Sequence, residues 1–378
     1  MDLYLQHYFD PDFNHLSLRP TQSGQELTDR YNLGYVQNVS KGQILAELIP
    51  LDKVADPLPR FITTDPVLPA GINTRVDPAY PHYLFADANG YVFYHEGKIV
   101  VKRLLNVRSD VDFHTGNIFF VGDAVIHKDV KAGFAVQANN LLINGIVEGG
   151  EIRARKDLKI EGGARGGANN RCLLDSGGDL RVSFVEKAEI RSKSKMLIER
   201  FCVHSSLYVA GDLVVNELVI GGTSQVAKYM LVRGNLGNKA EILTRVYLGY
   251  SPFVIRELEQ CDKRLTNLTE RINQYSAVVG HLPPDTNKMT CSLVSTREKR
   301  KKLLKLRESL WVTLHRDETQ ANACRLIVLG TVYPGVEISI GRSFLTIKEP
   351  LDGVFFRLRN DEIIIGKIPE KVFNYLKK

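Results

Sequence analysis

The chain has 378 residues, of which 44% are hydrophobic and 25% charged, with a formal net charge of +7. This composition is ordinary for a soluble globular protein of two or three domains. No apolar run approaches the roughly 20 residues that span a bilayer, and the first residues do not read as a secretory signal, so membrane-spanning and secreted classes are not expected.

Residues 1–100 are expected to form a small N-terminal β-rich domain with long loops. Seven prolines between positions 50 and 81 interrupt any long helix there. Residues 35–48 resemble two strands joined by a Ser40-Lys41-Gly42 turn, in which glycine can supply a positive φ. Residues 91–94 and 99–101 flank a further turn and predict a hairpin.

A short phrase recurs along residues 117–232. It reads Asn-Ile-Phe-Phe-Val-Gly at 117, Asn-Leu-Leu-Ile-Asn-Gly at 140 and Asp-Leu-Lys-Ile-Glu-Gly at 157, and related phrases begin at 179, 195, 212 and 229. Most steps correspond to one coil of 16 or 17 residues if five or six extra residues are allowed at 169–174. A fixed period of this kind marks a solenoid, whose repeats bury their apolar faces only by stacking.

The alternation inside each repeat predicts strands. Leu180 and Val182 share one face and Arg181 the other. Further short strands are expected between the phrases, so each coil would hold two or three. The chain is therefore predicted to be mainly β, with a parallel β-helix, a single-stranded solenoid, over residues 101–250. Because the spacing does not reduce to six residues, the right-handed form is favoured over the left-handed hexapeptide type.

The pattern changes at Ser251, a good N-cap, followed by Pro252 at the first helical position. Apolar residues then follow at spacings of three and four, and a second helix is expected from about 287 to 322 with Leu306 among its apolar positions. The prediction is an antiparallel coiled-coil hairpin over residues 251–325, about 40 Å long at 1.5 Å per residue. Its expected seam consists of Leu258, Leu265, Leu268, Ile272, Leu303 and Leu310.

A β pattern returns over residues 326–378. Strands are expected at 326–332, 336–341 and 345–347, followed by a pair at 354–358 and 362–365. The tail, residues 369–376, could form a short helix that caps the last coil.

No catalytic or metal-binding signature is present. The nine histidines are dispersed, and the five cysteines, at 172, 202, 261, 291 and 324, form no C-x-x-C pair. We therefore expect reduced thiols, no catalytic residue, no metal and no cofactor. Right-handed β-helices can carry carboxylate chemistry on polysaccharides, so a carbohydrate-active enzyme is the first alternative. Most acids of the repeat, however, lie at corners, where aspartate favours turns.

Residues 297–307 are the densest charge feature. Such a run can simply be the solvated face of a coiled coil, or it can be a patch for an acidic protein, an anionic lipid or a nucleic acid. Trp311 is the only close aromatic residue, which argues against base recognition. The candidate partner-binding residues are Arg297, Arg300, Lys301, Lys302 and Lys305.

Two phrases resemble a known family. Lys41-Gly42-Gln43-Ile44-Leu45-Ala46 is similar to a Lys-Gly-Gln-x-Leu-Ala phrase of the bacterial flagellar assembly protein A family, and residues 111–126 are similar to the phrase that precedes its β-helix. The family order, β-rich domain, β-helix, helical hairpin and return to β, is also reproduced. Residues 52–64 lack the glycines of a family motif, so the chain resembles a divergent and shortened member. The resemblance implies a cytoplasmic bacterial protein without known catalysis.

These observations favour a non-enzymatic cytoplasmic scaffold or assembly and localisation factor, linked to flagellar assembly or polar organisation. It would bind protein partners through the arm and the β-helix surface, could self-associate, and would lie in the cytoplasm, at the cell pole or the membrane periphery. The second alternative is a binder of anionic membrane surfaces or nucleic acid through the basic arm, with steep salt dependence.

Overall fold

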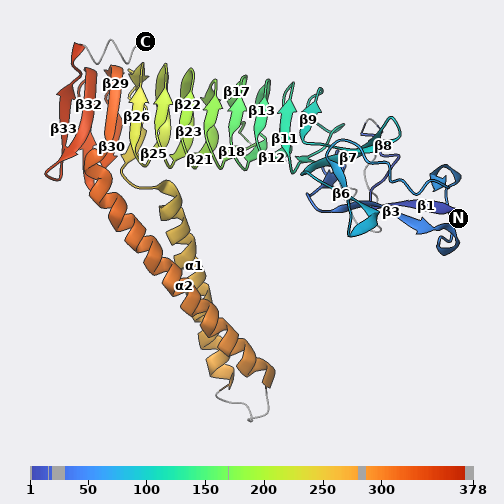
Figure 1. Cartoon of the computed structure of the whole chain (residues 1–378). Helices are drawn as coiled ribbons and strands as arrows, with labels where there is room; N and C mark the ends of the chain where they lie inside the picture. Colours follow the sequence, from blue (N-terminus) through green and yellow to red (C-terminus); the bar gives the residue numbers. More distant parts are fainter. Residues whose placement is uncertain (1, 16, 19–29, 169, 280–286, 371–378) are drawn as a thin grey trace. The chain divides into compact units, whose positions relative to one another are not determined.

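The computed structural model describes residues 2–15, 17–18, 30–168, 170–279 and 287–370. The chain divides into two compact units, Met1–Ile190 and Arg191–Lys378. Among the described residues, 25 strands belong to one large sheet, and Figure 1 shows its parallel strands arranged as successive coils. The predicted mainly β solenoid is confirmed. The right-handed sense of the coil and the domain boundaries stay predictions.

The N-terminal part of the first unit holds two small sheets in the described residues. The five-stranded sheet has the order β4-β1-β3-β6-β5, formed by β1 (Leu3–His7), β3 (Ile44–Pro50), β4 (Ile62–Thr63), β5 (Thr74–Asp77) and β6 (Tyr80–Ala86). The three-stranded sheet contains β2 (Asn38–Val39), β7 (Gly90–His95) and β8 (Lys98–Lys102). Short 3-10 helices cover Leu51–Lys53 and Pro59–Phe61.

The predicted strands of residues 35–48 are present, but they lie in different sheets. β2 pairs with β7, whereas β3 pairs with β1 and β6. The turn between them is closed by a hydrogen bond from the Gln43 N–H to the Ser40 carbonyl (3.0 Å), with Gly42 at φ 87°. The hairpin predicted around residues 95–98 is β7–β8. Leu5, Leu45 and Leu84 are among the residues of the common core.

The first unit continues as a parallel solenoid. Its strands are β9 (Leu104–Val107), β10 (Ile118–Phe119), β11 (Asp123–Ile126), β12 (Ala135–Ala138), β13 (Leu141–Ile143), β14 (Ile146–Glu148), β15 (Glu151–Ala154), β16 (Leu158–Ile160), β17 (Gly163–Arg165), β18 (Cys172–Ser176), β19 (Leu180–Val182), β20 (Val185–Glu186) and β21 (Ala188–Ser192).

Register explains the repeat. Leu141 pairs with Leu158, 17 positions on, and Leu158 pairs with Leu180, 22 positions on. The five extra residues fall between β17 and β18, because Val147 and Ala164 are 17 apart whereas Ile152 and Leu174 are 22 apart. The insertion predicted near 169–174 is thus confirmed. Since parallel pairing keeps like positions in line, the inward leucines and isoleucines stack directly on one another.

The second unit carries further coils. They consist of β22 (Met196–Ile198), β23 (Phe201–Val209), β24 (Leu213–Val215), β25 (Leu218–Val226), β26 (Tyr229–Val232), β27 (Asn235–Leu236), β28 (Thr244–Leu248), β29 (Arg325–Val332) and β30 (Val336–Ile340). The nine-residue strands β23 and β25 bend at His204 and at Gly221 and Gly222, which have positive φ. A Cβ on Gly222 would lie 2.1 Å from the Ser205 carbonyl oxygen, so this corner requires glycine.

Antiparallel strands follow the last parallel coil. β31 (Ser343–Thr346) pairs with β30, and β32 (Leu351–Arg359) pairs with β29 and with β33 (Glu362–Lys367). The two strands predicted around Arg359-Asn360-Asp361 are therefore confirmed. All but the first two residues of the predicted tail helix lie outside the described residues.

Two helices are inserted between β28 and β29, as predicted. They are α1 (Pro252–Val279, 28 residues) and α2 (Asn287–Gln320, 34 residues), and a short 3-10 helix at Ala321–Ala323 leads back to the sheet. Solenoid register is kept across this insertion, because Leu231 pairs with Ile327 and Leu248 with Ile340. At about 1.5 Å per residue, α1 is about 42 Å long.

Candidate partner-binding groove on the helical hairpin

The two helices run antiparallel along an apolar seam. Leu258 and Cys261 of α1 form a buried cluster with Leu310 of α2. The Cys261 thiol donates to the Leu303 carbonyl oxygen (3.4 Å), and Arg307 Nε donates to Asp262 Oδ1 (2.6 Å). Residues further along α1 therefore meet residues earlier in α2, and the two helices pack against each other through this seam.

The predicted seam residues are not equally buried. Leu258 and Leu310 belong to the buried cluster, and Leu265 and Leu303 pack against it. Leu268 and Ile272 are only partly buried. Leu306, expected on the apolar stripe of α2, is 39% exposed. The described seam is buried near the solenoid, at Leu258 and Leu310, and α2 is buried again further out, at Leu293 and Thr296. Between these two points leucine surface stays accessible.

A groove lies where this seam opens. Its volume is about 470 Å³, and it is lined by Arg264, Asn267, Leu268 and Arg271 of α1 and by Lys299, Lys302, Leu303 and Leu306 of α2. Leu268, Leu303 and Leu306 supply its apolar surface. The first and last lining residues are seven steps apart on each helix, or about 10 Å at 1.5 Å per residue.

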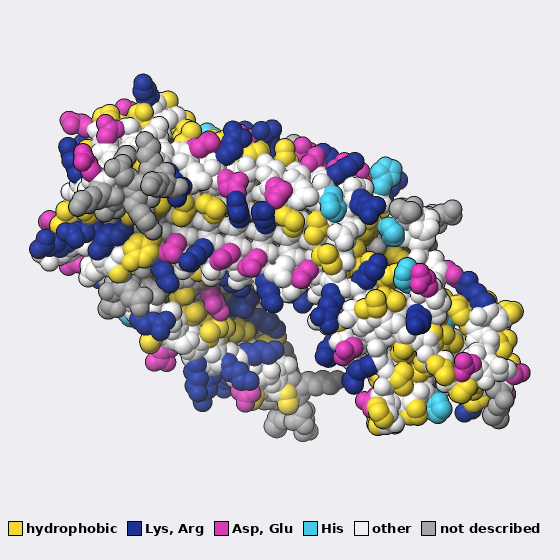
Figure 2. Space-filling model, turned by 45° about the horizontal axis from the view of Figure 1, so that its top comes forward, with side chains coloured by type: hydrophobic (Ala, Val, Ile, Leu, Met, Phe, Trp, Pro, Cys, Tyr) yellow, Lys and Arg dark blue, Asp and Glu magenta, His cyan; other side chains and the backbone are white. Residues whose placement is uncertain are grey.

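The charged residues that line the groove are all cationic. Arg264, Arg271, Lys299 and Lys302 belong to the lining, which contains no carboxylate. None of the four forms an ion pair with any residue that the structure describes. Arg271 Nη2 donates to the Tyr275 hydroxyl (3.2 Å), a hydrogen bond that raises the pKa of Arg271. Figure 2 shows hydrophobic side chains beside Lys and Arg side chains on the hairpin.

Only one of the predicted basic residues lines this groove. Lys302 belongs to its lining, whereas Arg297, Arg300, Lys301 and Lys305 are exposed elsewhere on α2. Each residue advances about 100° around a helix of 3.6 residues per turn, so a contiguous basic run surrounds the helix. Sequence reasoning missed Arg264, Arg271 and Lys299. The signal for them is a heptad spacing, because Arg264 and Arg271 lie seven positions apart on one side of α1.

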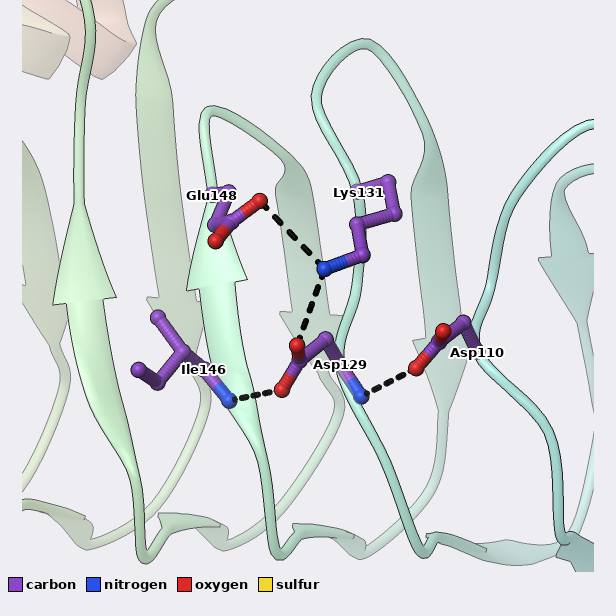
Figure 3. A network of polar contacts seen from close by, with 5 residues as sticks. All are labelled: Asp110, Asp129, Lys131, Ile146 and Glu148. Carbon is purple, nitrogen blue, oxygen red and sulfur yellow. Dashed lines mark hydrogen bonds and ion pairs between the residues drawn. The ribbon is translucent and has the colours of Figure 1, made fainter.

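A second polar cluster lies on the solenoid of the first unit, at one corner of successive coils (Figure 3). Asp110 Oδ1 accepts from the Asp129 N–H (3.0 Å), and Asp129 Oδ1 accepts from the Ile146 N–H (2.9 Å). Lys131 Nζ donates to Asp129 Oδ2 (2.9 Å) and lies 3.5 Å from Glu148 Oε2. The Asp110 and Asp129 carboxylates therefore each bind the backbone of the next coil.

This cluster gives the carbohydrate-active alternative no support. The hydrogen bond from the Ile146 N–H and that from Lys131 lower the pKa of Asp129, and the bond from Lys159 lowers the pKa of Glu161. A glycosidase needs one carboxyl group whose pKa is raised, so that it can donate a proton. The resolved shifts at Asp129 and Glu161 run the other way. Asp129 holds the backbone of the next coil, Glu161 pairs with Lys159 at the surface, and both carboxylates stay ionised.

Four of the five cysteines are buried, and Cys291 is exposed. Burial raises the pKa of Cys172 to about 11 and that of Cys202 to about 12, so neither is a ready thiolate. Within the described ranges no three His, Cys, Asp or Glu side chains are grouped as metal ligands. Nor does any helix of the described residues have the length and apolarity needed to cross a membrane.

Comparison with known proteins places this architecture in a family. No curated protein and no solved structure was found to match the chain. The model of the flagellar assembly protein A β-solenoid domain matches residues 103–363, which cover the solenoid, the hairpin and the return to β. That family is one of flagellar assembly proteins and not a known enzyme family. With more than half of its length matched, the chain belongs to the flagellar assembly protein A family.

Proposed function

We propose that this protein is a non-enzymatic scaffold in flagellar assembly. Its solenoid coils carry the hairpin, and the hairpin is an arm that docks a protein partner. The observation that carries this proposal is the groove of the hairpin, where leucine surface and four cations without a described ionic partner lie together. Apolar surface surrounded by polar residues marks interaction sites in soluble proteins.

The way the hairpin is attached also supports an arm. The sheet register continues from β26 to β29 in spite of the insertion, so the helices are not needed to complete the coils. The described seam buries few side chains, among them Leu258, Cys261 and Leu310. A segment that adds little to the core and presents charged and apolar surface is better suited to binding than to stability.

In this proposal the protein acts in the cytoplasm, at the cell pole or at the membrane periphery. The partner is a protein, and the groove selects it. Self-association would use the solenoid surface, because two copies of the groove would bring like charges together.

A deletion tests the proposal. Ala321 lies against Gly249, with 3.0 Å between the Ala321 Cβ and a Cβ built on Gly249, so a short Gly-Ser linker can replace residues 253–320. A fluorescent fusion of the whole chain in its own host is expected to form discrete foci, and the deleted form is expected to be diffuse and to reduce the number of assembled flagella.

Circular dichroism of the deleted form must still show the β signal of the solenoid, which controls for unfolding. Foci and flagellation that are unchanged by the deletion, in a form that keeps this signal, would contradict the arm as a docking element.

A further inference from the structure

We infer that the groove on the hairpin binds one acidic, amphipathic helix of a partner protein. This inference rests on the proposed function and specifies the chemistry of the partner. The helix would lie along the groove as a third strand of the coiled coil, with apolar side chains against Leu268, Leu303 and Leu306 and acidic side chains against the four cations.

The shape of the site favours a helix. The groove is formed by two helices that run side by side, and a third helix packs its side chains between such neighbours as knobs into holes. Its length of about 10 Å corresponds to two helical turns. An amphipathic helix presents apolar residues at positions i, i+3, i+4 and i+7, which is the spacing needed to fill two turns. Leu306 is the contact that α1 leaves open, because it is 39% exposed.

The charge of the site selects an acidic helix. Arg264 and Arg271 come from α1 and Lys299 and Lys302 from α2, so cations line the groove from both helices, and its lining contains no acid. A second copy of this hairpin would place cations against cations, and a neutral helix would leave them uncompensated. Glutamate or aspartate beside the apolar stripe would pair with the cations and fix the orientation of the helix.

An anionic bilayer is the competing occupant. Its surface attracts lysines and arginines in general, so the exposed Arg297, Lys301 and Lys305 would serve as well as the residues of the groove. Binding of the helix, in contrast, depends on the four groove cations and on the leucines between them. This difference provides matched variants on the same helix.

The experiment measures binding of a labelled peptide to the full chain by fluorescence anisotropy at physiological salt. The peptide has about 18 residues, or five helical turns, with leucine at spacings of three and four and glutamate beside them. One comparison peptide carries lysine in place of glutamate, and another carries serine in place of leucine. Vesicles of phosphatidylglycerol and phosphatidylcholine serve as the membrane probe.

Two double variants test the charge of the groove. Lys299→Glu with Lys302→Glu reverses two charges that line the groove, and the control, Lys301→Glu with Lys305→Glu, makes the same change in net charge outside it. The groove variant is expected to raise the Kd of the acidic peptide by about tenfold or more, since like charges at an interface cost several kcal/mol, and the control variant by less than about threefold. Circular dichroism confirms that both keep their helices.

A second variant and its control test the apolar contact. Leu306→Ala removes an exposed side chain of the groove, and Val312→Ala removes one that is 66% exposed elsewhere on α2. Only Leu306→Ala is expected to weaken binding, by about fivefold for a partly buried leucine. The lysine and serine peptides are expected not to bind.

Three results would overturn the inference. The two charge variants could lose affinity equally, the serine peptide could bind as well as the leucine peptide, or the groove variant could lose vesicle binding and keep peptide binding. If the hairpin deletion disperses the foci and peptide binding fails these tests, the inference is wrong and the proposed function stands. If the deletion leaves the foci unchanged, the proposed function itself is wrong.

Discussion

The solenoid and the hairpin bury the same kinds of apolar side chain to different extents. In the solenoid, Ile143 and Val182 are fully buried and Ile160 is 1% exposed, because each coil is covered by the next. In the hairpin, Leu258 and Leu310 keep 7% and 8% of their surface exposed, and Leu306 keeps 39%. The solenoid is stabilised by many stacked rungs, whereas the hairpin depends on a single seam between two helices.

This difference suits the solenoid to stability and the hairpin to binding. A solenoid coil contacts a neighbour on each side, so its outward residues can change at little cost. A two-helix arm cannot bury a whole apolar stripe, because each helix has only one partner. What remains uncovered, at Leu268 and Leu306, is what a third helix could use.

The largest expected effect is on the solenoid core. Leu174 is fully buried, and Leu174→Ala is expected to lower the free energy of unfolding by about 2–5 kcal/mol through lost burial and a cavity. Urea unfolding followed by the β signal in circular dichroism measures it. The matched control is Lys159→Ala, which removes only an exposed ion pair with Glu161 and should cost below about 1 kcal/mol. Equal losses in both would refute the stacked core.

A smaller and local effect is expected in the hairpin. Leu310→Ala should cost about 2 kcal/mol, the lower end for a buried leucine, because the cluster around Leu310 is small and can collapse after the substitution. Hydrogen exchange should accelerate at the amides of α1 and α2 and stay unchanged in the solenoid strands. Equal acceleration in both would show that they unfold as one unit and would contradict local opening of the hairpin.

Thiol labelling compares the two regions in one molecule. Cys202 is buried in β23 and Cys261 in the hairpin seam, with 1% and 2% of their surfaces exposed. Local opening of the hairpin should let Cys261 react at least about tenfold faster than Cys202, which corresponds to about 1.4 kcal/mol less for opening. Exposed Cys291 should react first and serves as the internal reference. Slower labelling of Cys261 than of Cys202 would contradict a loosely packed seam.

The smallest expected effect depends on pH. Hydrogen bonds from the Ile146 N–H and from Lys131 keep the pKa of Asp129 below its ordinary value. Its contribution to stability is therefore present above about pH 4, the ordinary range of aspartate, and is lost as the pH falls through the lower folded pKa. Asp129→Asn should lower the urea midpoint slightly at pH 7 and not at acidic pH. A difference that persists in acid would assign the effect to packing.

Much of the solenoid could be predicted because its strand register and its inward apolar positions repeat along the chain. The repeated phrase follows from the parallel register, so the 17-residue steps and the insertion near 169–174 are visible in the sequence. The start of the first helix and the end of the second are marked as clearly. Ser251-Pro252 marks the start, and the return of strand residues from about 325 marks the end. The pairing of β2 and β3 in separate sheets could not be predicted, because it depends on contacts with distant strands.

The groove could be predicted only in part. The basic run draws attention to α2, but density along the sequence does not tell which residues share a side, and only Lys302 of the five candidates lines the groove. Arg264 and Arg271 come from the other helix and join the site only when the seam fixes the helix register. Leu306 continues the apolar stripe in the sequence, and only the structure shows that α1 does not cover it.

The uninterrupted sheet at the base of the hairpin has a consequence for protein design. Val214 pairs with Leu231, 17 positions on, and Leu231 pairs with Ile327, 96 positions on, in the same parallel alignment. The coil therefore accommodates a long insert at this point without a frame shift in its core. A designer could lengthen, shorten or exchange the arm here, or graft another recognition module at the same junction.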